Sequence, residues 1–109
     1  MSEGQFDSVS VLKKSNVYFG GLCVSHTVQF ADGTRKTLGV LLPNPTGEAL
    51  KFNTQVAERM EIVSGECWVS IADAEKELFT AGQSFYVSGD SYFTVELKDV
   101  VDYVCHYEG

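Results

Sequence analysis

The feature that most constrains the fold is a succession of short segments in which apolar residues occupy every second position. In the segment Glu66–Ala72, for example, Cys67, Val69 and Ile71 alternate with polar side chains and one tryptophan. Because successive side chains of a β-strand point to opposite faces, a period of two predicts a strand that is buried on one face. No stretch keeps a helical period. The sequence therefore predicts about nine or ten short strands, a pattern typical of a β-sandwich or barrel.

Residues with turn chemistry separate these segments at close intervals. Asp32-Gly33 lies between two apolar runs, which predicts a hairpin between residues 22–30 and residues 35–42. The stretch Pro43–Gly47 is rich in proline, asparagine and glycine and predicts another turn. Turns at such spacing leave no room for long loops, so we expect an all-β sandwich or barrel.

Length and charge narrow the class further. The chain has 109 residues, which is enough for one domain with one hydrophobic core. We expect residues 1–15 to be loose and residues 16–109 to form that domain. The formal net charge is −7 and no basic stripe is visible, so neither nucleic acid nor an anionic membrane is an expected partner. No apolar run could span a bilayer and the first residues are not a signal peptide, so we expect a cytoplasmic protein.

The three cysteines lie far apart, each in an apolar segment: Cys23, Cys67 and Cys105. Their number is odd and they form no Cys-x-x-Cys pair. This pattern favours buried, reduced thiols over a disulfide framework.

The stretch Phe52–Gly65 holds the first candidate site residue. Glu58, Met60 and Ile62 fall on one face of its second strand. A carboxylate that shares a face with methionine and isoleucine must be hydrogen-bonded, paired, or placed at a rim that water or a ligand reaches. Glu58 is therefore a candidate for a functional role.

The spacing around Glu58 resembles the two sequence motifs of the cupin superfamily. Six residues separate Glu58 from Gly65, and five separate Gly82 from Ser88-Gly89. In metal-binding cupins the first motif has two histidines before its glutamate and the second motif has one. The corresponding positions of this chain hold other side chains: Phe52, Thr54 and Tyr92. One carboxylate does not make a first coordination shell, so we expect no metal.

A second resemblance covers nearly the whole chain from Asn16 onward. Its fragments occur in order: Asn16-x-Tyr18-Phe19-x-Gly21, Gly33-x-Arg35 with Leu38-Gly39-Val40, Phe52-x-Thr54 with Glu58-x-Met60-x-Ile62-x-Ser64-Gly65, Ala81-Gly82-x-x-Phe85-x-Val87-x-Gly89-x-Ser91-x-Phe93, and Tyr103-x-Cys105-x-Tyr107. Together they resemble the small cupin-like pyrimidine/purine nucleoside phosphorylases. The chain departs from that family at Ser88, where proline is usual, in a longer loop at Pro43–Glu48, and at His106, where arginine is usual.

The resemblance implies a cytoplasmic, metal-independent, single-domain cupin that assembles as a homodimer. The implied reaction is phosphorolysis of many purine and pyrimidine nucleosides to free base and ribose 1-phosphate, with inorganic phosphate as co-substrate and no other cofactor. Two other classes stay open: a metal-dependent cupin enzyme whose ligands lie outside the motifs, and a non-catalytic module that binds a small molecule. For the dimer surface, the sequence suggests Trp68 together with Val40 and Val63, although the outer face of a second sheet would explain Trp68 equally.

An acidic protein needs a dedicated cation to hold phosphate, and Arg35 is our candidate. It follows the predicted hairpin and shares a face with Thr37 and Gly39, away from Leu38 and Val40. Arginine binds phosphate through two parallel hydrogen bonds. The alternative is an arginine that is simply solvated at the end of a hairpin.

The remaining candidates would hold the nucleoside. Glu58 would accept hydrogen bonds from the ribose hydroxyls or face the positive charge that develops on the sugar, unless it only pairs with an arginine. Four aromatic side chains would form a base-stacking wall, or else plain core: Phe52, Phe93, Tyr103 and Tyr107. Thr54 and Ser91 are candidates for hydrogen bonds to the substrate, although threonine is common in strands and serine in turns.

Overall fold

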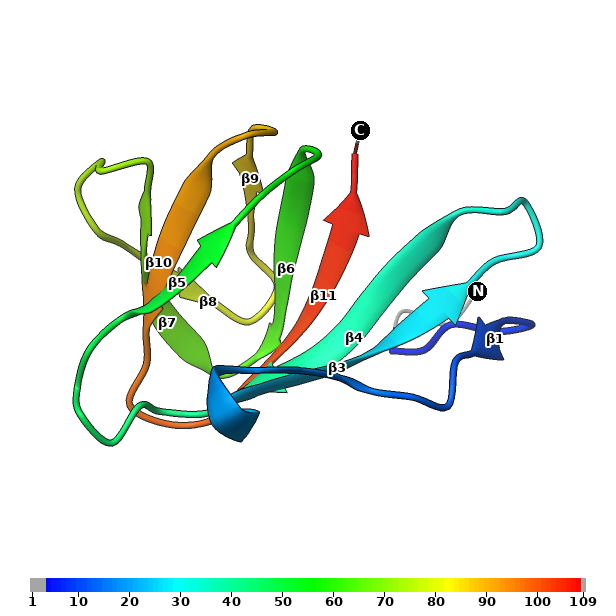
Figure 1. The fold of residues 1–109 in the computed structure, drawn as a ribbon, viewed down its shortest axis with the longest axis horizontal. Helices are drawn as coiled ribbons and strands as arrows, with labels where there is room; N and C mark the ends of the chain where they lie inside the picture. Colours follow the sequence, from blue (N-terminus) through cyan, green and yellow to red (C-terminus); the bar gives the residue numbers. More distant parts are fainter. Residues whose placement is uncertain (1–3, 109) are drawn as a thin grey trace.

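The computed structural model describes residues 4–108, which form two antiparallel β-sheets (Figure 1). A short 3-10 turn, η1 (Phe19–Gly21), follows the second strand. The strands are β1 (Ser10–Val11), β2 (Asn16–Tyr18), β3 (Cys23–Gln29), β4 (Arg35–Leu41), β5 (Leu50–Asn53), β6 (Glu58–Ser64), β7 (Glu66–Ile71), β8 (Glu77–Thr80), β9 (Ser84–Val87), β10 (Tyr92–Glu96) and β11 (Val101–Tyr107).

The larger sheet has the strand order β1-β3-β4-β11-β6-β9, with β2 paired to β3. The smaller sheet has the order β5-β10-β7-β8. The chain passes repeatedly from one sheet to the other, as at β4 to β5, β6 to β7 and β10 to β11, so neighbours in sequence lie on both sides of the core (Figure 1). The predicted all-β class is confirmed.

The core lies between the two sheets and follows the alternation seen in the sequence. Met60 and Ile62 of β6 point inward, as do Val69 of β7 and Val95 of β10, and each is at most 3% exposed. The rest of the buried cluster comes from the same inward positions of the other strands: Cys23, Leu41, Leu50, Cys67, Phe85, Val87, Phe93, Val101, Tyr103 and Cys105. All three cysteines are buried free thiols, as predicted.

The hairpin predicted at Asp32-Gly33 is confirmed. The Phe30 backbone amide donates a hydrogen bond to the Thr34 carbonyl at 2.9 Å, and the Gly33 amide donates to the Phe30 carbonyl at 3.0 Å. Strands β3 and β4 then pair antiparallel from Gln29–Arg35 to Cys23–Leu41. This register turns Thr37 and Leu41 inward and leaves Leu38 exposed, so the inner face of β4 carries both a polar and an apolar side chain.

The structure bears on two surface features of the sequence analysis, the N-terminal segment and Trp68. Of residues 1–15, residues 1–3 lie outside the described part of the chain, and Ser10 and Val11 pair with β3.

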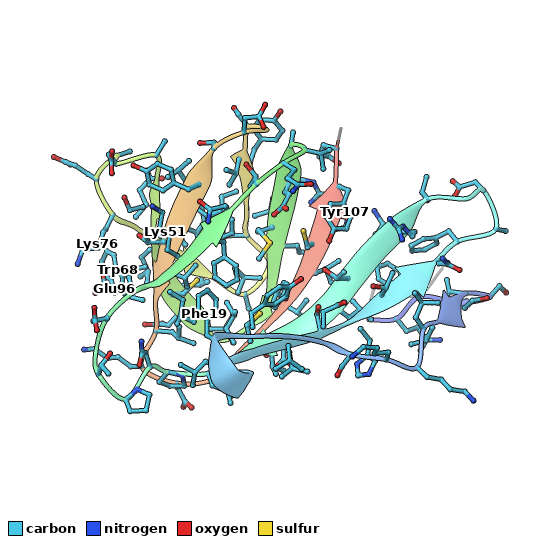
Figure 2. All side chains as sticks on the ribbon, in the orientation of Figure 1. Phe19, Lys51, Trp68, Lys76, Glu96 and Tyr107 are labelled. Atoms are coloured by element: carbon cyan, nitrogen blue, oxygen red, sulfur yellow. The ribbon has the colours of Figure 1, made fainter. Side chains whose placement is uncertain are left out.

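Trp68 is exposed on β7 in the smaller sheet, on the same side as Lys76 and Glu96 (Figure 2). Val40 and Val63 belong to the larger sheet, so the grouping of Trp68 with these two valines is wrong. The sequence pattern could not assign the strands to sheets.

Candidate functional site

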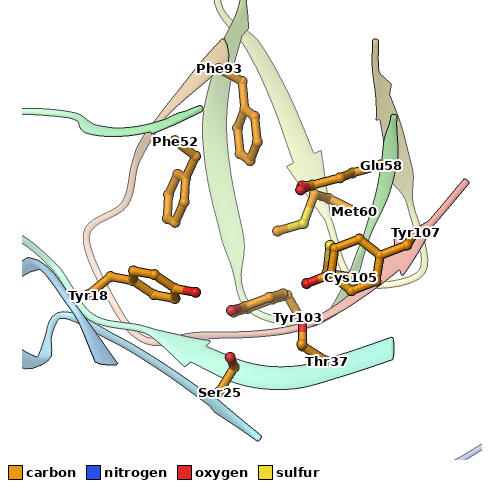
Figure 3. Close-up of a pocket in the computed structure, with 10 residues that line it drawn as sticks. All are labelled: Tyr18, Ser25, Thr37, Phe52, Glu58, Met60, Phe93, Tyr103, Cys105 and Tyr107. Carbon is orange, nitrogen blue, oxygen red and sulfur yellow. The ribbon is translucent and has the colours of Figure 1, made fainter. Parts of the chain in front are cut away.

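A cavity of about 80 Å³ opens between the sheets at the end where β6 and β11 carry Glu58 and Tyr107 (Figure 3). Seven strands contribute to its wall, and five of its ten lining residues were predicted from the sequence. Those five are Phe52, Glu58, Phe93, Tyr103 and Tyr107. The others are Tyr18, Ser25, Thr37, Met60 and Cys105. The cavity thus has an aromatic and apolar side and a side lined by hydroxyl, thiol and carboxyl groups.

The aromatic side is built by stacking. The rings of Phe52 and Phe93 are nearly parallel, at an interplanar angle of 12° and a centroid distance of 5.1 Å. Phe19 packs its edge on Phe52 at 82° and 5.1 Å, and Phe85 lies edge-on to Phe93 at 5.4 Å. Such packing holds each ring in place without polar contacts. This wall can accept a flat apolar ring but offers no side-chain amide to read its edge.

Glu58 is the carboxylate of the cavity. It lies at the start of β6, opposite Tyr107 of β11 and Val87 of β9, and its side chain enters the cavity above Met60 (Figure 3). Burial raises the pKa of Glu58, and a hydrogen bond from the Cys105 thiol partly opposes this rise. No salt bridge to Glu58 forms within residues 4–108. A half-buried carboxylate with one weak donor is available to bind hydroxyl groups of a ligand.

The Cys105 thiol is the centre of a small network beside Glu58. Burial and the negative charge of Glu58 raise the pKa of Cys105 to about 12, so the group stays a neutral thiol. The hydroxyls of Thr37 and Tyr107 lie near the same sulfur and oppose part of this rise in pKa. Because the thiol is protonated and raised in pKa, Cys105 is a positioning group here and has none of the thiolate character of a nucleophile.

Tyr103 forms the floor of the cavity. Its hydroxyl lies 3.4 Å from the Cys23 sulfur, and Ser25 is a further hydrogen-bond partner. Burial raises the pKa of Tyr103 well above its usual value. The phenol passes over Gly39 of β4, where an added Cβ would lie 2.9 Å from the tyrosine oxygen. With its hydroxyl so occupied, Tyr103 serves as a wall.

Thr54 and Ser91 lie outside the cavity lining. The Thr54 hydroxyl donates to the Ser88 carbonyl at 2.7 Å and accepts from the Ser91 backbone amide at 3.0 Å. The Thr54 amide also donates to the Ser91 carbonyl at 2.9 Å. These bonds tie the end of β5 to the turn before β10, so both residues fix the turn next to the aromatic wall.

Arg35 lies in a second, larger hollow that adjoins the cavity. This hollow has a volume of about 380 Å³, and its wall includes Asn16, Thr27, Thr34 and Arg35. Three residues line both spaces: Tyr18, Thr37 and Tyr107. Arg35 makes no salt bridge within the described part of the chain. The structure thus brings an unpaired guanidinium next to the cavity that holds Glu58.

His106 points to the opposite face of the larger sheet, as the alternation along β11 predicts. Its Nδ1 lies 2.7 Å from Lys36 Nζ and its Nε2 lies 2.8 Å from Glu61 Oε1. An ammonium group can only donate, so Nδ1 accepts from Lys36 and Nε2–H donates to Glu61. Burial lowers the pKa of His106, and the positive charges of Lys36 and Arg59 add to this effect. His106 bridges β4 and β6 behind the cavity wall.

The sequence analysis did not predict five of the lining residues as site residues, although most of them lie in a recognisable sequence pattern. Ser25 and Thr37 are polar residues on the inward faces of β3 and β4, where an apolar core would need none. Cys105 lies between Tyr103 and Tyr107 on one face, and Met60 follows Glu58 on another. Tyr18 stands before the turn η1, and only the three-dimensional fold brings it to the cavity.

Within residues 4–108, no group of three or more histidine, cysteine or acidic side chains is arranged to hold a metal ion. None of the described segments is a helix with the length and apolar character needed to cross a bilayer.

The fold and site define a class of protein: a single-domain, cupin-like barrel whose aromatic cavity holds a half-buried carboxylate next to an arginine. The family model for pyrimidine/purine nucleoside phosphorylases matches residues 13–107, and the chain belongs to this family. A pyrimidine/purine nucleoside phosphorylase of Acinetobacter baylyi is 68% identical over the full length of both chains. One from Cupriavidus taiwanensis is 54% identical over 99% of this chain and 100% of its own.

Solved structures agree on the fold. A crystal structure of a protein of unknown function from Acinetobacter sp. ADP1 superposes with a TM-score of 0.92, at 67% identity over 96% of this chain and 99% of its own. The hydroxypropylphosphonic acid epoxidase of S. wedmorenis superposes with a TM-score of 0.70, at 13% identity over 94% of this chain and 56% of its own. This second similarity supports the cupin-like fold alone.

Proposed function

We propose that this protein is a nucleoside phosphorylase of broad specificity, which cleaves purine and pyrimidine nucleosides with inorganic phosphate to free base and ribose 1-phosphate. One observation carries the proposal. An aromatic cavity that contains Glu58 adjoins a polar hollow that contains Arg35, and the two spaces share three lining residues. Phosphorolysis needs such a pair of neighbouring sites, one for the nucleoside and one for the anion.

The base would bind against Phe52 and Phe93. Stacking on an aromatic ring stabilises a nucleobase by roughly 1–3 kcal/mol and works for every base. Among the described residues, no asparagine, glutamine or aspartate lines the cavity, so this wall has no amide or aspartate to distinguish one base edge from another. This supports one site for both purines and pyrimidines.

Phosphate would bind Arg35 in the polar hollow, where threonine hydroxyls add hydrogen-bond donors. In the reaction, the bond between C1′ and the base nitrogen breaks and its electron pair stays on the base. A phosphate oxygen forms the new bond to C1′, and the proton that phosphate loses neutralises the departing base. Glu58 would bind the ribose hydroxyls and, when ionised, stabilise the positive charge on the sugar.

We further propose that the reaction needs no metal, takes place in the cytoplasm and is carried out by a homodimer. The outer face of the larger sheet supports the dimer, because it holds an apolar hollow lined by Leu38, Val40, Val63 and Val104.

Sedimentation velocity tests the dimer, and Leu38→Glu should give a monomer in this experiment. The control Leu78→Glu, an equally exposed leucine on the smaller sheet, should leave the dimer intact. A monomeric wild type would contradict the assembly.

The experiment that tests the activity is a phosphate-dependent assay. EDTA-treated protein is incubated with uridine and with inosine, with and without phosphate, and free base is measured by chromatography. We expect base release from both nucleosides only when phosphate is present. Release that stops after chelation would favour a metal-dependent enzyme, and binding of nucleosides without release would favour a non-catalytic module.

The variant Arg35→Ala tests the proposed phosphate site. Removing a charge-assisted hydrogen-bond donor costs about 1.5–3 kcal/mol, so Arg35→Ala should raise the KM for phosphate roughly 10- to 100-fold. Lys13→Ala removes an exposed positive charge that lines neither space and serves as the control. An unchanged KM for phosphate in Arg35→Ala would remove Arg35 from the site.

A further inference from the structure

Tyr18 lies at the junction of the two spaces. It lines the aromatic cavity together with Phe52 and also lines the polar hollow together with Arg35. In Figure 3 its phenol points toward the centre of the cavity from the side opposite Glu58. If the base binds in one space and phosphate in the other, the ribose must occupy the junction, because it is covalently joined to the base and is attacked by phosphate.

The three residues at the junction differ in their surroundings. Thr37 is 7% exposed, and both Thr37 and Tyr107 lie near the Cys105 thiol and lower its pKa. Tyr18 is 52% exposed and makes no side-chain hydrogen bond with any other residue of the described range 4–108. Its hydroxyl is therefore free for a ligand.

The backbone after Tyr18 holds the phenol at this place. Phe19 has a φ of +53°, a left-handed conformation that costs a residue with a Cβ about 1–2 kcal/mol. The Phe19 ring packs at 82° against Phe52, a ring that lines the cavity. On the other side, Tyr18 pairs with Cys23 at the end of β2. A strained residue that is anchored to the cavity wall fits a segment selected for binding.

We propose that Tyr18 is a specificity-determining residue whose hydroxyl hydrogen-bonds a hydroxyl of the ribose ring, and that it thereby favours ribonucleosides over deoxyribonucleosides. The proposal rests on the proposed phosphorolysis and names a contact of that same site. Glu58 and Tyr18 then hold the sugar from opposite sides, the carboxylate as acceptor and the phenol as donor or acceptor.

The test compares Tyr18→Phe with the wild type on uridine, 2′-deoxyuridine and 3′-deoxyuridine. The variant keeps the ring and removes only the hydroxyl. A lost hydrogen bond in a binding site lowers affinity for the transition state about tenfold, so kcat/KM for uridine should fall by about that factor. With the deoxynucleoside that lacks the contacted hydroxyl, wild type and variant should have nearly equal kcat/KM. Tyr86→Phe, at an exposed tyrosine outside both spaces, is the control and should change nothing.

The outcomes separate this proposal from the proposed function. Activity of the wild type with any nucleoside decides the function, whereas the ratio of variant to wild type across the three substrates decides Tyr18. If Tyr18→Phe lowers kcat/KM by the same factor for all three substrates, or does not lower it for uridine, the role of Tyr18 is overturned while phosphorolysis stands. If the wild type is inactive, equilibrium dissociation constants for the same three nucleosides give the same comparison, and equal ratios or no binding would again overturn it.

Discussion

Gly39 provides a quantitative test of how the cavity floor is built. In the structure a Cβ added at this position would lie 2.5 Å from the Val24 carbonyl oxygen, 2.8 Å from Ser25 Cβ and 2.9 Å from the Tyr103 hydroxyl oxygen. Two of these neighbours belong to the backbone or Cβ of the paired strand β3 and cannot rotate away. Gly39→Ala must therefore separate β3 from β4 or push Tyr103 into the cavity.

The expected cost follows from these contacts. Overpacking of a core by one methyl group costs about 1–3 kcal/mol, and three contacts below 3.0 Å place Gly39→Ala at the upper end, about 3 kcal/mol. For a domain of this size that corresponds to a fall in melting temperature of roughly 10–20 °C. Displacement of Tyr103 should also raise the KM for the nucleoside, because the ring would enter the base site.

Two other glycines give matched controls in thermal and denaturant unfolding. Gly33→Ala has open space around the Cβ but a φ of +88°, so it should cost about 1 kcal/mol. Gly4→Ala has open space and no such constraint, so it should change stability by less than about 0.5 kcal/mol. The prediction is the order Gly39, Gly33, Gly4. A stability loss in Gly39→Ala no larger than that in Gly33→Ala would refute the close packing of β3, β4 and Tyr103.

Two further predictions concern ionisable groups. Because burial raises the pKa of Glu58, ionisation of this carboxyl group as the pH rises lowers the stability of the folded protein. Glu58→Gln should therefore increase the free energy of unfolding at pH 7.5 and lower kcat. The exposed control Glu66→Gln should change neither quantity. Reduced stability of Glu58→Gln at pH 7.5 would show that the carboxylate is a structural partner. Because burial lowers the pKa of His106, the unfolded chain takes up the proton first, and stability should fall as pH drops below about 6.5. Urea unfolding at pH 7.5 and at pH 5.5 measures this loss of stability, which should be smaller in His106→Gln than in the exposed control His26→Gln. An equal loss of stability in the two variants would contradict the bridge from His106 to Lys36 and Glu61.

The sequence predicted the fold well where alternation and turn chemistry act locally. The hairpin at Asp32-Gly33 and the inward face of Glu58 and Met60 both follow from patterns within a few residues. The same period explains why His106 lies on the face away from Tyr103 and Tyr107, which both line the cavity. These features need only the strand period and the φ of a turn residue.

The features that the sequence could not supply depend on which strands become neighbours. Trp68 and Val63 are only five positions apart in the chain, yet they lie on different sheets because the chain crosses over after β6. Thr54 has the residue type of a substrate contact, but its hydroxyl is engaged by Ser88 and Ser91, more than thirty positions away. Tyr18 reaches the cavity only because β2 pairs with β3 and η1 turns the chain back.

The most direct test of the central claim is the identity of the sugar product. Phosphorus-31 and proton NMR of the protein with uridine and inorganic phosphate should show ribose 1-phosphate and uracil appearing in equal amounts, while inorganic phosphate is consumed. Uracil released with free ribose and constant phosphate would mean hydrolysis, and an unchanged spectrum with intact uridine would mean that the cavity binds without catalysis. Either result would contradict phosphorolysis at this site.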